Sequence, residues 1–218
     1  MTWAPQLEAV GRIASSEERI AQYTRLLERA LHDTPSASLP SLIRTYVDGA
    51  VLDPVNTTGA GLLVGRHMLA HLATQLAAAH IPANILCTIV SDTLATCEAS
   101  SIMGDDELGP WRVLLAEQYA SLSRWRDAAQ ALQSITPHAA RRIPQLSFAQ
   151  LCVRVVELWL HDLPSHVAEA EQAIKRANSA ILDERDNKAL VHELWSYHPR
   201  VLANQNRFIE ACLLSTGA

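Results

Sequence analysis

Three observations predict that this chain is an all-α protein, a right-handed solenoid of antiparallel helical hairpins. Hydrophobic residues make up 49% of its 218 residues, and runs of β-branched residues are rare. The 8 glycines and 10 prolines cluster between apolar periodic stretches, so connections are short and successive helices should run antiparallel. The third observation is a spacing pattern that recurs in the C-terminal half of the sequence.

About ten helices are expected, and several of their limits have a physical cause. The stretch "SSEER" places Ser before acidic residues, which suits a helix N-terminus. A helix cannot continue through Pro35 and Pro40. Further breaks are expected at "MGDDELGP", "ITPHAARRIPQ" and "HDLPSH". The expected helices cover residues 17–31, 39–52, 60–79, 82–100, 106–122, 124–135, 145–162, 165–182, 186–203 and 206–214.

The sequence divides into three parts that form one continuous solenoid. Residues 1–16 are expected to be a flexible N-terminus, and residues 17–104 form irregular helical hairpins. Residues 105–218 form hairpins of the tetratricopeptide-like or HEAT-like kind. Pro199 falls inside one expected helix, so that helix either bends there or is broken at "SYHP".

The recurring pattern is the spacing of small and large apolar residues in tetratricopeptide repeats. Its key alanines are Ala128, Ala170 and Ala211, which are 42 and 41 residues apart. Only a small side chain fits where two helices of a hairpin cross closely. Trp125 and Phe208 are interpreted as wedges in the core, which cover the hairpin end and meet the next repeat, rather than as a ligand-binding box. The other repeat positions are Ala116, Tyr119, Leu132 and Ile135 in one hairpin and Val156, Trp159, Ile174 and Ala177 in the next.

No catalytic constellation is apparent, and no catalytic, cofactor-binding or metal-binding residue is expected. The stretch "GAGLLVGRH" matches neither glycine-rich phosphate motif and is expected to be a turn before a helix. His67 and His71 share a helix face, but Met68 stands where a zinc protease needs glutamate. The acidic residues 105–107 are explained by their place at a helix start. The protein is therefore not expected to be an enzyme, and no cofactor is expected.

Charge, thiols and hydropathy exclude several other classes. The net charge is −5, and Lys and Arg do not gather on any one segment, so no nucleic-acid partner is expected. No apolar stretch is long enough to span a membrane, and no signal peptide is apparent. Free thiols are expected at the four cysteines, as in an intracellular protein. The sequon at Asn56 is interpreted as a chance match.

Five segments resemble the N-terminal half of the family of subunit four of the COP9 signalosome. They occur in that family's order and spacing, and the resemblance spans residues 20–214. The "W-R-D-A-A" and "R-F-I-E-A" motifs are the most specific, and both are packing motifs. The segments are "YTRLLERAL", "GRHMLAHLATQL", "LLAEQYASLSRWRDAAQAL", "LWLHDLPSHVAEAEQAIKRANS" and "RVLANQNRFIEACL".

The resemblance implies a non-catalytic scaffold and substrate-sensing arm. The family's complex removes the ubiquitin-like modifier NEDD8 from cullins, and a different subunit performs that chemistry. The implied partners are other signalosome subunits and a cullin–RING ligase, at its RING protein and cullin C-terminal region. The implied location is the nucleus and cytoplasm. Binding residues remain unknown, because no motif marks them.

Two alternatives to the signalosome remain open. The first is the paralogous subunit of the proteasome regulatory lid, or another scaffold subunit of the PCI type. The second is an independent peptide-binding solenoid or a metal-dependent enzyme. The family's subunit normally continues into a PCI winged-helix domain, which is expected to be absent because this sequence stops at "LLSTGA".

Overall fold

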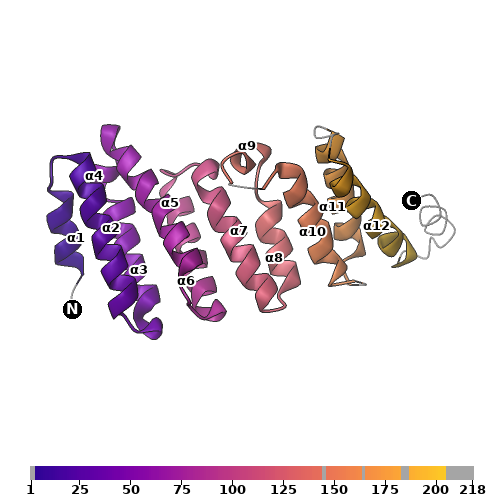
Figure 1. Ribbon diagram of the computed structural model, residues 1–218, viewed down its shortest axis with the longest axis horizontal. Helices are drawn as coiled ribbons and strands as arrows, with labels where there is room; N and C mark the ends of the chain where they lie inside the picture. Colours follow the sequence, from indigo (N-terminus) through magenta and orange to yellow (C-terminus); the bar gives the residue numbers. More distant parts are fainter. Residues whose placement is uncertain (1–2, 144–145, 164, 183–186, 205–218) are drawn as a thin grey trace. The chain divides into compact units, whose positions relative to one another are not determined.

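The computed structural model describes residues 3–143, 146–163, 165–182 and 187–204, and all its regular elements are helices (Figure 1). The prediction of an all-α chain of helical repeats is confirmed for these residues. The chain divides into two compact units, Met1–Gln118 (unit 1) and Tyr119–Ala218 (unit 2). This boundary falls inside a helix, whereas the sequence places its own division between residues 104 and 105.

Unit 1 is built on two pairs of packed helices, α2 with α5 and α3 with α6. Their buried side chains recur every three or four residues, as in α2, where Arg19, Tyr23, Leu27 and Ala30 form one stripe. Apolar residues of α5 and α6 complete the core. The α-helices are α1 (Ala4–Gly11), α2 (Ser16–Asp33), α3 (Leu39–Tyr46), α4 (Pro54–Thr57), α5 (Leu62–Ala78), α6 (Ala83–Ser100) and α7 (Asp105–Ser121), which ends in unit 2.

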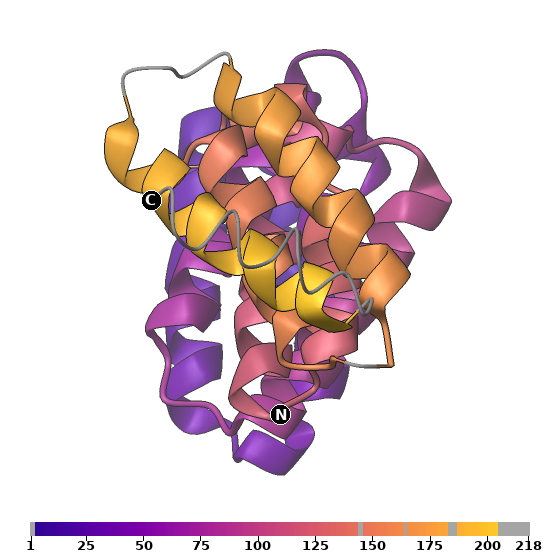
Figure 2. The same ribbon diagram turned by 90° about the vertical axis from the view of Figure 1, so that its right-hand side faces the viewer.

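Unit 2 is organised around α10, a helix that is buried on nearly all sides. It packs against α8, α11 and α12, and Figure 2 looks onto α12 with α11 beside it. A capping box begins α10, since Ser147 Oγ accepts from the Gln150 backbone N–H and the Gln150 side chain accepts from the Ser147 N–H. The helices are α8 (Trp125–Gln133), α9 (Pro137–Ala140), α10 (Phe148–Leu160), α11 (Val167–Leu182) and α12 (Lys188–Asn204).

The expected helix limits mostly hold, because they rest on capping and proline. At the start of α2, Ser15 Oγ accepts from the Glu18 backbone N–H, as "SSEER" predicts. The helix α12 runs through Pro199 without a break, which answers the question left open at "SYHP". The expected helix 206–214 lies outside the described residues.

Four helical segments differ from the prediction. Residues 1–16 are not simply a flexible terminus, because α1 occupies Ala4–Gly11 and buries Leu7 and Val10. The one-turn helices α4 and α9 lie in stretches left between the expected helices, and each begins with a capped proline turn. The expected helix 39–52 is not α-helical throughout, since Val47–Val51 form a π-helical turn.

Candidate interaction surface

The glycine-rich stretch before α5 allows close packing of backbone and does not form a ligand loop. A Cβ atom on Gly61 would lie 1.8 Å from the Val55 carbonyl oxygen. A Cβ atom on Gly65, one turn later, would lie 2.7 Å from the Val51 carbonyl oxygen. Side chains here would separate α5 from the segment that contains α4. The interpretation of this stretch as a turn before a helix is confirmed, and the glycines gain a packing role.

The histidine pair stands on α5 as its spacing predicts. The rings of His67 and His71 are stacked at 6.5 Å between centroids, with 7° between their planes. His67 is exposed and His71 is half-buried. Among the described residues, no three His, Cys, Asp or Glu side chains lie together in a way that could hold a metal ion. The pair is therefore a feature of the helix surface.

A buried polar cluster lies at the centre of unit 1. The Asn56 amide, which is 0% exposed, donates to the Tyr23 hydroxyl at 3.3 Å and to the Ala50 carbonyl at 2.9 Å. The Tyr23 hydroxyl donates to the Gly49 carbonyl, and the Tyr46 hydroxyl donates to the Tyr23 carbonyl. Burial raises the pKa of Tyr46 and of Tyr23, so both phenols stay protonated at neutral pH. Asn56 holds the π-helical turn against α2, and its burial excludes glycosylation in the folded chain.

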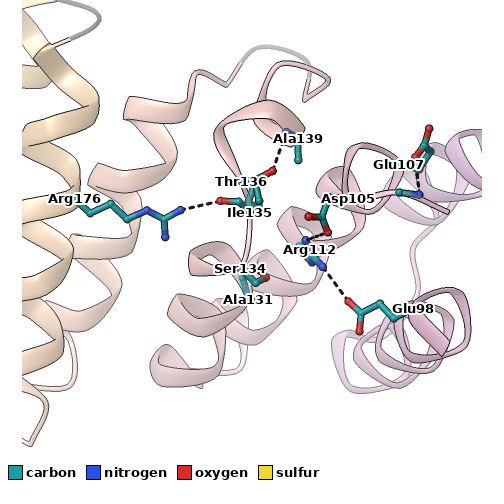
Figure 3. A network of polar contacts seen from close by, with 11 residues as sticks. Glu98, Asp105, Glu107, Arg112, Ala131, Ser134, Ile135, Thr136, Ala139 and Arg176 are labelled. Atoms are coloured by element: carbon teal, nitrogen blue, oxygen red, sulfur yellow. Dashed lines mark hydrogen bonds and ion pairs between the residues drawn. The ribbon is translucent and has the colours of Figure 1, made fainter. Parts of the chain in front are cut away.

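Ion pairs join α6 and α7 within unit 1. Figure 3 shows Arg112 between Glu98 and Asp105, with nitrogen–oxygen distances of 3.1 and 3.2 Å. Nearby, Glu107 accepts from the Gly104 backbone N–H and pairs with Arg66 at 3.1 Å. The acidic start of α7 is thus used to cap the helix and to fix it to α5 and α6, which agrees with the structural interpretation of these acids.

An open groove of about 620 Å³ lies in unit 1, beside the start of α1 and the start of α3. Trp3, Pro35 and Leu42 supply its apolar lining. Two of its hydroxyl groups bond to nearby backbone, since Ser41 donates to the Ser38 carbonyl and Thr45 to the Ser41 carbonyl. The rest of its polar lining comes from Asp33, Thr34 and Ser38, and Asp33 pairs with His32.

In unit 2 the repeat positions are packing positions, as the spacing predicts. Ala128, Ala170 and Ala177 are each 0% exposed. The large repeat residues Leu132, Ile135, Val156, Trp159 and Ile174 are also buried. Ala211 and Phe208 of the third repeat lie outside the described residues. The first two hairpins thus bury these positions in the same register, except that Tyr119 is only half-buried where its counterpart Trp159 is buried.

Arg176 joins two consecutive hairpins of unit 2, a role that the repeat spacing does not reveal. From α11 its guanidinium donates to the Gln133 and Ile135 carbonyls at 2.7 and 2.9 Å. Figure 3 shows the bond to Ile135. It also lies 5.1 Å from the centre of the Phe148 ring. The arginine satisfies carbonyls at the C-terminal end of α8, where a cation is also favoured by the helix dipole.

One edge of unit 2 combines arginine, tryptophan, tyrosine and histidine. Figure 1 shows the first turn of α8 and the last turn of α10 at the same, lower edge of this unit. Ser123 has a left-handed backbone (φ 58°), and the chain bonds back from the Arg124 N–H to the Tyr119 carbonyl. We call this surface the basic aromatic edge, which consists of Tyr119, Leu122, Arg124, Trp125, Arg126 and His161.

Side chains of the basic aromatic edge hold one another in place. The Arg124 guanidinium lies 4.3 Å from the centre of the Tyr119 ring and pairs with Asp127 at 2.7 Å. The Trp125 ring stacks on His161, with 4.3 Å between centroids and 20° between planes. The expectation that Trp125 meets the next hairpin is confirmed. Its burial is only partial, however, so its role extends to the surface.

The edge belongs to a basic segment in an acidic chain. Residues 119–142 contain four arginines and one aspartate, a net charge of +3. The other residues together carry −8. Whole-chain counting hides this segment, and a charge count over each hairpin would have found it. The expectation that Lys and Arg gather on no one segment is therefore wrong for residues 119–142.

The fold defines a class of protein, an α-helical repeat protein whose contacts are made through hairpin faces and loops. Within that class, the chain is similar to COP9 signalosome complex subunit 4 of Caenorhabditis elegans, with 29% identity over 209 residues. The similarity covers 91% of this chain and 49% of the relative, so the chain spans about half the relative's length. No known family model matches the chain.

Among the described residues, no helix has the length and apolar character needed to cross a membrane.

Proposed function

We propose that the chain is a non-catalytic scaffold subunit of a COP9 signalosome complex. The observation that carries this proposal is the similarity to a signalosome subunit over 91% of the chain. The helical-repeat architecture of both units supports it, because repeat proteins present extended surfaces to partners. The raised pKa of a buried thiol also fits a structural role. Burial raises the pKa of the Cys97 thiol to about 11, so this thiol is held in its unreactive protonated form.

Within such a complex, the proposed role is a substrate-sensing arm. Its partners would be other signalosome subunits and a cullin–RING ligase, contacted at the RING protein and the cullin C-terminal region. The complex would remove a ubiquitin-like modifier from the cullin, with the chemistry supplied by another subunit. The chain would then reside where this complex works, in the nucleus and cytoplasm.

Affinity purification tests the scaffold role. The tagged chain would be expressed in cells, and the subunits that copurify would be identified by mass spectrometry. We expect signalosome subunits in amounts comparable to the chain itself. A matched control is Ala128→Arg. This variant places a charge at a fully buried position where two helices pack closely, and it should reduce copurification. Recovery of neither signalosome nor related subunits would overturn the proposal.

The substrate-sensing role needs a separate measurement. Purified chain would be titrated against a cullin–RING complex and against the same cullin without its RING protein. Saturable binding that weakens without the RING protein is expected. Equal binding to both would remove the RING protein as a partner but leave the scaffold role standing.

The alternative is a scaffold subunit of the proteasome regulatory lid or another PCI complex. It is favoured by the nature of the repeat positions, such as Ala128 and Ala170, which specify helix packing and would suit any helical-repeat scaffold. The same purification separates the two assignments, since lid subunits would then copurify in place of signalosome subunits.

A further inference from the structure

We propose that the basic aromatic edge of unit 2 binds an acidic segment of a partner protein. Carboxylates of that segment would pair with Arg124 and Arg126, and its apolar side chains would pack against Leu122 and Trp125. The proposal is independent of which complex contains the chain.

Charge is the first argument for an acidic partner. At the edge itself, Arg124 and Arg126 stand against Asp127 of the same turn, a local excess of one positive charge, while the residues outside 119–142 carry −8. Asp162, which follows His161, pairs with His166. Arg126 is exposed on the first turn of α8. The Arg124 side chain is 52% exposed and pairs with Asp127. Guanidinium groups recognise carboxylates through paired hydrogen bonds, so this edge favours an acidic ligand.

The second argument is that the edge is ordered before any partner binds. Arg124 is held between the Tyr119 ring and Asp127, and Trp125 is stacked on His161. Side chains that are already ordered lose less entropy on binding. Trp, Tyr and Arg are also the residues in which interface binding energy concentrates. Leu122 adds an apolar contact, since it is 40% exposed beside these residues.

The arrangement of the arginines favours protein over nucleic acid. Arg124 and Arg126 flank the start of α8, whereas Arg141 and Arg142 follow α9, beyond the other end of α8. A nine-residue helix is about 13 Å long, so the four cations do not form one continuous track. Nucleic-acid binding usually neutralises several successive phosphates. Two arginines beside an exposed leucine and a half-buried tryptophan suit a short segment that is both acidic and apolar.

Fluorescence anisotropy of a labelled peptide tests the proposal on the full chain. The probe is a synthetic peptide of repeated Glu-Glu-Leu, and the neutral comparison is repeated Gln-Gln-Leu. We expect saturable binding of the acidic peptide that weakens as salt rises. Arg124→Glu and Arg126→Glu should each weaken binding about tenfold, since each reverses a charge at the contact.

Arg154→Glu is the matched control variant. The Arg154 side chain is 52% exposed, as is that of Arg124, and it also pairs with an acid three residues away. Its reversal should change affinity by no more than about twofold, because Arg154 lies in the middle of α10, outside the edge. Circular dichroism of each variant should match that of the unmodified chain, since the substituted arginines are exposed.

Three results would overturn the proposal. The first is equal binding of the acidic and neutral peptides, and the second is an Arg154→Glu variant as weak as Arg126→Glu. The third is tighter binding of an oligodeoxythymidine of equal length than of the acidic peptide, which would assign the edge to nucleic acid. The proposed scaffold function would survive each of them, because it is tested by copurification of subunits.

Discussion

Unit 1 and unit 2 are both helical, yet they hold their helices together by different means. Unit 1 relies on a buried polar cluster around Asn56 and on backbone contact at Gly61. Unit 2 relies on small residues at regular spacing, such as Ala128 and Ala170. The units also differ in charge, because unit 1 carries 13 acidic and 7 basic residues and unit 2 carries 10 and 11. The unit with regularly spaced small residues is thus also the unit with the larger share of basic residues.

The largest expected effect comes from Gly61→Ala in unit 1. The added Cβ would lie 1.8 Å from the Val55 carbonyl oxygen, so the backbone of α4 or α5 must move. We expect a loss of about 3 kcal/mol or more in the free energy of unfolding. Gly59→Ala is the control, since its Cβ would meet open space. Its left-handed backbone (φ 54°) should cost only about 1 kcal/mol.

Urea denaturation followed by circular dichroism would measure both glycine variants. Hydrogen exchange would show whether the loss is centred on α4 and α5. Equal destabilisation by the two substitutions would mean that the contact at Gly61 is not what fixes α4 against α5.

The second expected effect tests the repeat register of unit 2. Ala128→Val and Ala170→Val each add two methyl groups at a fully buried position. Each should cost about 2 kcal/mol through overpacking. Ala168→Val on the exposed surface of α11 is the control, and it reports the lower helix propensity of valine alone. If Ala168→Val destabilised the chain as much as Ala170→Val, a small residue would not be required at position 170 for close packing of the helices.

These two predictions also show how far the sequence could be interpreted. Residues such as Ala170 and Trp159 could be placed because one hairpin constrains the next through a repeated spacing. Asn56 could not be placed, because its partners Tyr23 and Ala50 are set by the irregular turn at 47–51. A sequon is a local pattern, and it carries no information about burial.

The basic aromatic edge was only partly predictable for the same reason. Trp125 was expected to contact the next hairpin, and its stacking on His161 agrees. The contribution of His161 depends on the length of the turn between α10 and α11, which varies between repeats. The same holds for Arg176, whose acceptors at Gln133 and Ile135 lie more than 40 residues away. Contacts between repeats depend on loop geometry, which cannot be predicted well from the spacing of residues in the sequence.

The third expected effect concerns the link between hairpins. Arg176→Met retains a long apolar stem but removes both hydrogen bonds to the end of α8. We expect a loss of about 1.5 kcal/mol, because the two carbonyls lose a charged donor. Lys175→Met is the control, since its side chain is 73% exposed and its ion pair with Glu171 lies at the surface, so it should cost less than about 0.5 kcal/mol. Thermal unfolding of both variants provides the measurement, and equal losses would contradict the linking role.

The smallest expected effect concerns alkaline pH, and it should separate the two units. Burial raises the pKa of Tyr46 and Tyr23 above the ordinary value of 10.0, so the folded state resists their ionisation. The unfolded state then binds fewer protons above pH 10, and stability falls as pH rises through that value. In unit 2, the pKa of Tyr197 is also raised, to about 12, by burial and by its hydrogen bond to Glu193. Tyr197 lies less deeply than Tyr46, so unit 1 should unfold first.

Tyr46→Phe tests this difference directly. The variant loses the hydrogen bond to the Tyr23 carbonyl and should be about 1 kcal/mol less stable at neutral pH. It also loses a group that must ionise on alkaline unfolding, so its stability should fall less steeply above pH 10 than that of the unmodified chain. Tyr197→Phe should leave the slope for unit 1 unchanged. Phenolate absorbance during urea unfolding at several pH values gives both slopes. If Tyr46→Phe and the unmodified chain lost stability in parallel, the buried tyrosines of unit 1 would not be the cause of its alkaline sensitivity.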